Sequence, residues 1–321
     1  MREVTFLQQN ADNWKQIETS LQKKDASISA DKLGDLFIHL SDDLAYAKTH
    51  YSKSKTTHYL NELTLKVHQR IYKNKKEKTN RWFTFWKYEV PEILYENRRY
   101  LLISFLFFFI SFLIGMLSAA NDPTFVNLIL GDEYVQMTKT NIENGDPMAV
   151  YKKMGQTEMF LYITFNNVRV SFNTFILGIL ASIGTILILF YNGVMLGSFQ
   201  YYFYEFGVLK QSLLTVWIHG TLEISAIVIA GAAGLIMGNS ILFPGTYTRL
   251  ASFKMGAIKG LKVVMALVPI FIIAGFLEGF VTRHTGMPVW LSLFIILGSL
   301  FFIIFYFLYY PNLLHKQNSL K

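Results

Sequence analysis

The side chains most able to do chemistry in this chain are ionisable groups inside long apolar segments. His219 and Glu223 are four residues apart, so they stack on one face of a helix. Glu278 lies in a later apolar segment. Such groups are costly in a membrane and usually carry function or pair with one another. A histidine and two carboxylates are a donor set for a divalent metal and also a route for protons.

A second set of polar residues is spread along the chain. Asn166, Arg169 and Asn173 follow steps of three and four, and they therefore share one helix face. Arg283 directly follows the apolar segment that contains Glu278. Because all these residues fall near one predicted membrane depth, we expect them to meet the histidine and the two glutamates in one intramembrane polar cluster.

Three interpretations of this cluster are open. It could be a structural network in which Arg169 pairs with one of the two glutamates. It could bind a metal through His219, Glu223 and Glu278, with a further histidine, His284, in reserve. The HxxxE step, however, is not the HExxH zinc signature. It could also relay protons or pass a solute.

A serine hydrolase is poorly supported. Ser212 and Ser225 are near His219 in the sequence, but no nucleophile-elbow pattern surrounds them. The chain has no cysteine, which excludes disulfides and cysteine-based zinc sites. We therefore name no catalytic residue and predict no cofactor and no resident metal; His219, Glu223 and Glu278 are the weak metal candidates.

Long apolar stretches must position these residues. Leu101–Ala120 is 20 residues without a charge, which is enough to cross a hydrocarbon core of roughly 30 Å. The stretch Arg169–Phe206 is 38 residues, nearly twice the length that one span needs, and it contains Tyr191-Asn192-Gly193, a turn-forming sequence. We predict an all-α polytopic protein, a six-helix transmembrane bundle over 100–310. The predicted spans are about 101–120, 169–190, 193–206, 213–237, 263–282 and 289–310.

The distribution of charge predicts the orientation. Residues 1–99 hold 18 of the 30 Lys+Arg, and the loop 240–262 has four basic residues and no acidic one. The loop 121–160 has six acidic residues against three lysines. Short cytoplasmic loops tend to retain Lys and Arg. Both termini, including the tail 311–321, are therefore expected in the cytoplasm, and the loop 121–160 is expected outside it.

Residues 1–80 are predicted to form a cytoplasmic helical segment. Leu33, Leu40 and Leu44 belong to an apolar stripe with helical spacing, and Leu60 and Leu63 belong to a second one. Two or three such helices would pack as a small bundle.

Residues 81–99 mix cations with aromatic side chains directly before the first span, as an amphipathic helix on an anionic leaflet does. No nucleic-acid motif accompanies them, so we predict contacts with lipid headgroups and no nucleic-acid partner. The residues concerned are Arg81, Trp82, Trp86, Lys87, Arg98 and Arg99.

Small residues at helical spacing predict close helix packing. Gly220 is expected to let another backbone approach between His219 and Glu223. The same spacing could join spans within one chain or pair two chains, so a homo-oligomer is left open. The turn and packing residues are Asn192, Gly193, Gly197, Gly220, Gly234 and Gly238.

Several of these motifs occur in a recognisable order. Phe165-Asn166-Asn167, Asn192-Gly193, His219-Gly220-Thr221-Leu222-Glu223 and the stretch from Glu278 to Arg283 resemble the stage II sporulation protein M family, over roughly residues 100–310. The resemblance implies a bacterial cytoplasmic (inner) membrane location and adds Asn167 to the polar cluster. Named members in spore-forming bacteria work with peptidoglycan-degrading partners during engulfment. The N-terminal hundred residues resemble an extension found in relatives of uncertain function, and Ile218 stands where the family often has proline.

The function that these observations predict is a membrane organiser or scaffold in a bacterial cell-envelope complex, with a link to peptidoglycan remodelling implied by the resemblance. Its expected partners are membrane lipids and envelope proteins. One alternative is a transporter or channel that uses the Arg/His/Glu cluster. Another is an intramembrane metal-dependent hydrolase.

Overall fold

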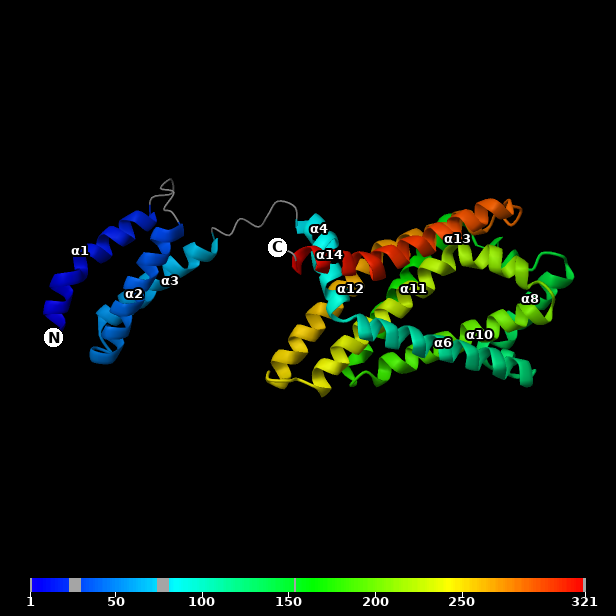
Figure 1. The fold of residues 1–321 in the computed structure, drawn as a ribbon, viewed down its shortest axis with the longest axis horizontal. Helices are drawn as coiled ribbons and strands as arrows, with labels where there is room; N and C mark the ends of the chain where they lie inside the picture. The colour runs from blue at the N-terminus through cyan, green and yellow to red at the C-terminus, as the bar shows by residue number, and fades with distance from the viewer. Residues whose placement is uncertain (1, 23–29, 74–80, 153, 320–321) are drawn as a thin grey trace. The chain divides into compact units, whose positions relative to one another are not determined.

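The computed structural model describes residues 2–22, 30–73, 81–152 and 154–319. These residues form helices and no strands, which confirms the all-α prediction. The chain divides into two compact units, residues 1–81 and 82–321 (Figure 1). Each unit has a hydrophobic core of its own.

The first unit is a bundle of α1 (Glu3–Gln22), α2 (Ala30–His50) and α3 (Lys55–Lys73). The predicted apolar stripes supply its core, in which Leu33, Leu40 and Leu60 are buried. Trp14 is 2% exposed, and its indole N–H donates a hydrogen bond of 2.8 Å to Asp43 Oδ2. The predicted small bundle is therefore confirmed, while its cytoplasmic position stays a prediction.

The second unit begins within a short helical run formed by α4 (Arg81–Thr84), η1 (Phe85–Glu89) and α5 (Val90–Glu96). Its apolar side, including Val90 and Leu94, is buried. Two ion pairs join its other side to a later helix: Lys259 Nζ lies 2.6 Å from Glu96 Oε2 and Lys262 Nζ lies 2.7 Å from Glu89 Oε2. Of the six residues predicted to contact lipid headgroups, only Trp86 is half-buried. The exposed ones are Arg81, Trp82, Lys87, Arg98 and Arg99.

Five helical segments of the described residues are long and apolar enough to cross a membrane. They are α6 (Arg98–Asn121), α10 (Ile183–Glu205), α11 (Leu209–Leu242), α12 (Arg249–Phe276) continued by η4 (Leu277–Thr282), and α13 (Val289–Ile304) continued by η5 (Phe305–Tyr309) and α14 (Tyr310–Ser319). The chain is a multi-pass membrane protein by this measure.

The turn predicted at Asn192-Gly193, and with it the division into spans 169–190 and 193–206, is wrong. Helix α10 runs through both residues without a break, and Asn192 Nδ2 donates to the carbonyl of Ile188 one turn earlier. The chain turns instead after α9 (Gln156–Ile176) and η3 (Leu177–Ile179), where Ala181 and Ser182 adopt positive φ. Tertiary contacts hold this turn, because Ser182 packs against Gly238 of α11.

Glycines set the spacing and direction of the helices in the second unit. A Cβ on Gly193 would lie 2.6 Å from Ser111 Cβ, and one on Gly197 would clash with the Phe112 carbonyl. The residue numbers of the contacting positions increase in the same direction along both helices, so α6 and α10 run parallel. Thr185 and Leu189 of α10 contact glycines of α11 whose residue numbers decrease as those of α10 increase. Helices α10 and α11 are therefore antiparallel. Gly193, Gly197, Gly234 and Gly238 therefore form the close helix contacts that their spacing predicted, and these contacts lie within one chain, an arrangement that the spacing left open.

Between α6 and α9, residues 122–152 together with 154 and 155 form a folded segment, here called the cap. It contains α7 (Phe125–Leu130), α8 (Asp132–Glu143) and η2 (Ala149–Lys152). Val126, Val135 and Met148 of the cap share a small core with Tyr202 and Phe203 at the end of α10. The cap is thus packed onto one end of the bundle, here called the capped end.

Gly193→Val should destabilise the second unit, because the added side chain must displace Ser111 and the Phe108 carbonyl. Overpacking of this kind costs about 1–3 kcal/mol, which thermal unfolding in detergent would detect. Gly298→Val is the matched control, since nothing lies within 4 Å of a Cβ at that helical position. Equal unfolding temperatures for the two variants would contradict the packing.

Candidate functional site

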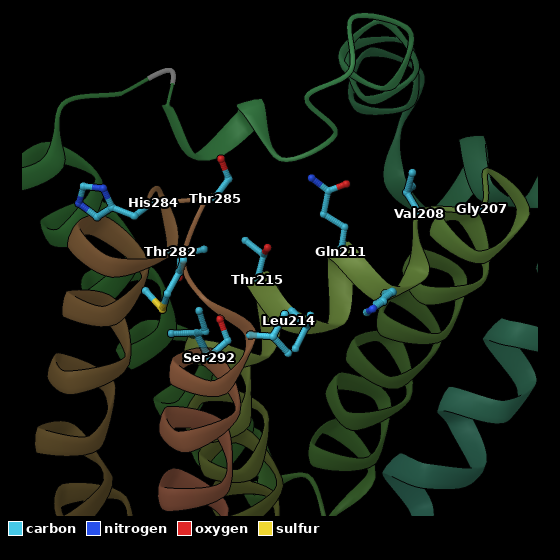
Figure 2. A pocket seen from close by; sticks show the side chains of 13 residues that line it. Gly207, Val208, Gln211, Leu214, Thr215, Thr282, His284, Thr285 and Ser292 are labelled. Atoms are coloured by element: carbon cyan, nitrogen blue, oxygen red, sulfur yellow. The ribbon is translucent and has the colours of Figure 1, made fainter.

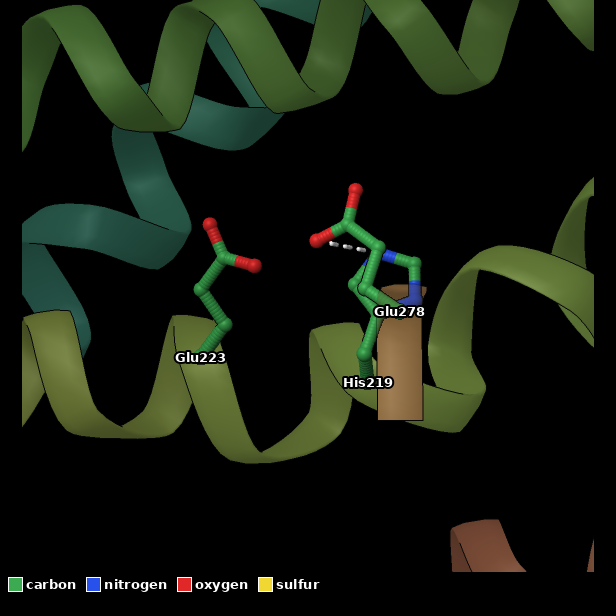
Figure 3. A group of neighbouring side chains, drawn as sticks. All are labelled: His219, Glu223 and Glu278. Atoms are coloured by element: carbon green, nitrogen blue, oxygen red, sulfur yellow. Dashed lines mark ion pairs between the residues drawn. The ribbon is translucent and has the colours of Figure 1, made fainter. Parts of the chain in front are cut away.

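His219, Glu223 and Glu278 meet at one place in the bundle (Figure 3). His219 Nε2 lies 3.6 Å from Glu278 Oε2, and one ligand atom of each of the three residues lies within 4.8 Å of the others. The His219 side chain is 5% exposed and that of Glu278 is 12% exposed. The meeting of these three residues, which the sequence predicted, is therefore present.

Two elements position these side chains. The helical step of four stacks His219 and Glu223 on one face of α11. Glu278 and Thr282 come from η4, a π-helical segment, and such segments occur often at functional sites. Thr282 Oγ1 lies 3.0 Å from His219 Nδ1 and donates to the Leu277 carbonyl at 3.1 Å. The contact with Thr282 thus orients the imidazole through Nδ1, and Nε2 faces Glu278.

A cavity of about 430 Å³ adjoins the three residues. Its wall combines α9, α10, α11, η4 and the cap. Asn167 of α9 is buried in this wall, and Tyr134 and Tyr151 reach it from the cap. The cluster is therefore not sealed in packed side chains; it faces a space that can hold a small group of atoms.

The two tyrosines supply hydrogen-bond donors to this cavity. Burial raises the pKa of Tyr134 to about 12 and holds the pKa of Tyr151 well above its usual value of 10.0, with the Glu278 charge adding to both shifts. Both phenols therefore keep their protons at neutral pH. The Tyr151 ring lies edge-on to the His219 ring, with 5.7 Å between their centroids.

Arg169 and Asn173 were predicted to join the cluster, and this prediction is wrong. Asn166, Arg169 and Asn173 do share one face of α9, but all three are exposed, and it is the adjacent Asn167 that is buried on the side of α11. Asn166 reaches the edge of the cavity. Arg169 has no ion-pair or hydrogen-bond partner in the described part of the chain. The spacing of these residues correctly predicted that they share one helix face, but it did not predict that this face points away from the bundle.

Arg283 also lies outside the cluster. Its guanidinium donates to the carbonyls of Met154 at 3.2 Å and Lys152 at 3.3 Å. Arg283 thus ties the end of η4 to the cap, and no lysine or arginine in the described residues pairs with the two glutamates.

Gly220 has a different role from the one predicted. No other helix approaches it, since the nearest atom to an added Cβ would be Val216 Cγ1 of the same helix at 3.8 Å. It lines the cavity instead and keeps that part of α11 open. Sequence reasoning also missed Thr282, Tyr134 and Tyr151. Of these three residues, only Thr282 could have been predicted from the sequence, because it lies four residues after Glu278 and therefore on the same helix face.

A second, smaller pocket of about 320 Å³ lies at the ends of α11 and α13 (Figure 2). Gln211, Thr215 and Ser292 contribute to its wall, and Thr282 lines it too. Because Thr282 also contacts His219, it stands between this pocket and the cluster. The pocket itself lacks grouped carboxylates, so the larger cavity is the better candidate for chemistry.

The comparisons with known proteins match both units. The family described as Stage II sporulation protein M matches residues 104–283. A family described as a domain of unknown function (DUF8413) matches residues 4–73. Searches of curated proteins and of solved structures gave no match.

Arg283→Lys should loosen the cap while it keeps the positive charge, because lysine cannot reach two carbonyls with one planar fork. We expect faster hydrogen exchange at Ala149–Lys152 in mass spectrometry. Arg249→Lys, at the exposed start of α12, is the matched control and should leave this exchange unchanged. Unaltered exchange in Arg283→Lys would contradict the role given to this residue.

Proposed function

The chain belongs to the stage II sporulation protein M family of membrane proteins, and on this premise we propose that it is a six-pass protein of the bacterial cytoplasmic membrane that organises a complex of the cell envelope. Both termini lie in the cytoplasm in this proposal, and the cap lies outside it. The role in the complex is to hold partner proteins within the membrane.

Helix α9 is the sixth pass in this proposal. It is more polar than the other five, but it follows α12 through the bundle: Phe175 lies near Gly260, Thr164 near Gly275 and Phe160 near Gly279. Its 21 residues are long enough to span a hydrocarbon core. Apolar side chains such as Leu161, Tyr162 and Phe165 are exposed on α9, as lipid contact requires.

Charge supports the orientation. The end opposite the cap carries Arg98, Arg99 and the basic residues of the α11–α12 hairpin, among them Arg249 and Lys254. Residues 121–160, which include the cap, have an excess of acidic residues. The basic end is therefore the cytoplasmic end by the positive-inside tendency.

The exposed polar stripe on α9, formed by Asn166, Arg169 and Asn173, is the observation that carries the organiser role. Polar residues in membrane helices almost always face a bundle interior or an aqueous cavity, and an arginine at the bilayer centre costs about 2.5–3.5 kcal/mol on the insertion scale. Arg169 is exposed on the outside of this bundle. A partner helix with a carboxylate or amide acceptor would cover the stripe and remove this cost.

The six-pass threading can be tested with single cysteines, because the chain has none of its own. Leu180→Cys lies in the α9–α10 turn, Tyr247→Cys lies in the α11–α12 hairpin, and Asn144→Cys lies in the cap. An impermeant thiol reagent should label Asn144→Cys in spheroplasts. The other two should react only after the membrane is opened. Labelling of Leu180→Cys from outside would contradict the sixth pass.

The partner surface can be tested in native membranes. Asn173→Cys carrying a benzophenone should form adducts with another membrane protein, because it lies beside Arg169 on the stripe. Leu297→Cys is the matched control on the exposed apolar face of α13 and should react mainly with lipid. Arg169→Leu should greatly reduce the protein adduct from Asn173→Cys.

Equal protein adducts from the two faces would show that the stripe has no special partner. Adducts only with lipid, or only with a second copy of this chain, would contradict the proposed role in a multiprotein envelope complex.

A further inference from the structure

The hydrogen bonds of Thr282 determine which nitrogen of His219 carries its proton. A hydroxyl group has one hydrogen, and Thr282 donates it to the Leu277 carbonyl. The 3.0 Å contact of Thr282 Oγ1 with His219 Nδ1 therefore needs the hydrogen of Nδ1. In the neutral imidazole, Nε2 is then unprotonated, and its lone pair points away from Thr282 and toward the glutamates.

Three electron-pair donors consequently converge. His219 Nε2 lies 3.6 Å from Glu278 Oε2, and Glu223 completes a group in which all the ligand atoms are within 4.8 Å. Lone pairs and carboxylate oxygens repel one another unless a proton or a metal cation lies between them. Arg169 and Arg283, the basic side chains expected to serve, face elsewhere.

We propose that His219 Nε2, Glu223 and Glu278 together bind one divalent transition-metal ion of the zinc class. Zinc bonds of about 2.0–2.2 Å to nitrogen and oxygen place neighbouring ligands of a tetrahedron about 3.3–3.6 Å apart. The 3.6 Å between Nε2 and Oε2 meets this spacing, and Glu223, whose oxygen lies within 4.8 Å of the other two ligand atoms, would close on the ion as the third ligand. A dication also cancels the two carboxylate charges.

The cavity side of the cluster carries a second, independent sign of a ligand. Asn167 is 3% exposed, and its side chain already interacts with the Glu223 carboxylate, which orients that proposed ligand. The Trp217 Nε1 atom in the same wall is buried without a hydrogen-bond partner among the described residues. Buried donors need acceptors, and an oxygen ligand on the metal's remaining position would satisfy this indole N–H.

Thr282 acts as a positioning residue for the metal. Histidines that bind metals usually donate the hydrogen of their other ring nitrogen to a fixed acceptor, and loss of that acceptor weakens metal binding by about 10–100-fold. Thr282→Val keeps the shape of the side chain but removes the acceptor. It should therefore raise the dissociation constant for Zn²⁺ by about tenfold or more.

Metal content is the direct measurement. The full chain, purified in detergent, equilibrated with Zn²⁺ and freed of excess by gel filtration, should retain about one zinc per chain, one ion for the one three-residue site. His219→Gln, Glu223→Gln and Glu278→Gln should each weaken binding by at least about tenfold. His284→Gln is the matched control, because His284 is exposed and lines only the smaller pocket.

X-ray absorption of the zinc-loaded wild-type protein gives a readout that does not depend on variant folding. One imidazole nitrogen and carboxylate oxygens at about 2.0–2.2 Å would support the site. No retained zinc in the wild type, several imidazoles in the spectrum, or equal loss in His284→Gln and His219→Gln would overturn it. The proposed partner surface on α9 is not involved, so either proposal can fail without the other.

Discussion

Close backbone contact at glycines is the constraint on which the membrane unit depends. Lipid tails are as apolar as leucine, so helices in a bilayer associate through close packing and hydrogen bonds rather than through hydrophobic burial. Here α10 meets α6 at Gly193 and Gly197 and meets α11 at Gly234. The α9–α10 turn is held against Gly238 in the same way. These contacts fix the spacing and direction of α10 relative to α6 and α11.

The polar cluster follows from that arrangement. Helix α11 brings His219 and Glu223 on one face, and the π-helical end of the α12 segment brings Glu278 and Thr282 to the same level. The two segments contact one another along the bundle, so their polar residues are positioned by rigid helices rather than by loops. The cap adds Tyr151 beside the histidine and forms part of the cavity wall.

The chain thus has two separate regions of unbalanced charge. Inside the bundle, Glu223 and Glu278 face a histidine nitrogen and have no lysine or arginine partner among the described residues. Outside it, Arg169 is exposed on α9 without an acidic one. Arg169 is not an ion-pair partner of Glu223, because Asn167 is the α9 residue that lies beside Glu223. An ion would balance the first region, and a partner helix would balance the second.

Sequence alone determined the class of the protein and the three residues at the centre of its site, His219, Glu223 and Glu278. Long uncharged segments predicted membrane helices, because only apolar side chains are stable in lipid, and the helical step of four placed His219 and Glu223 together. Periodicity states which residues share a helix face but not which way that face points. Only the tertiary structure could therefore bury Asn167 and expose Arg169. The chain reverses at the Ala181-Ser182 turn and not at Asn192-Gly193 as predicted, because packing against α11 and α6 outweighs local turn preference.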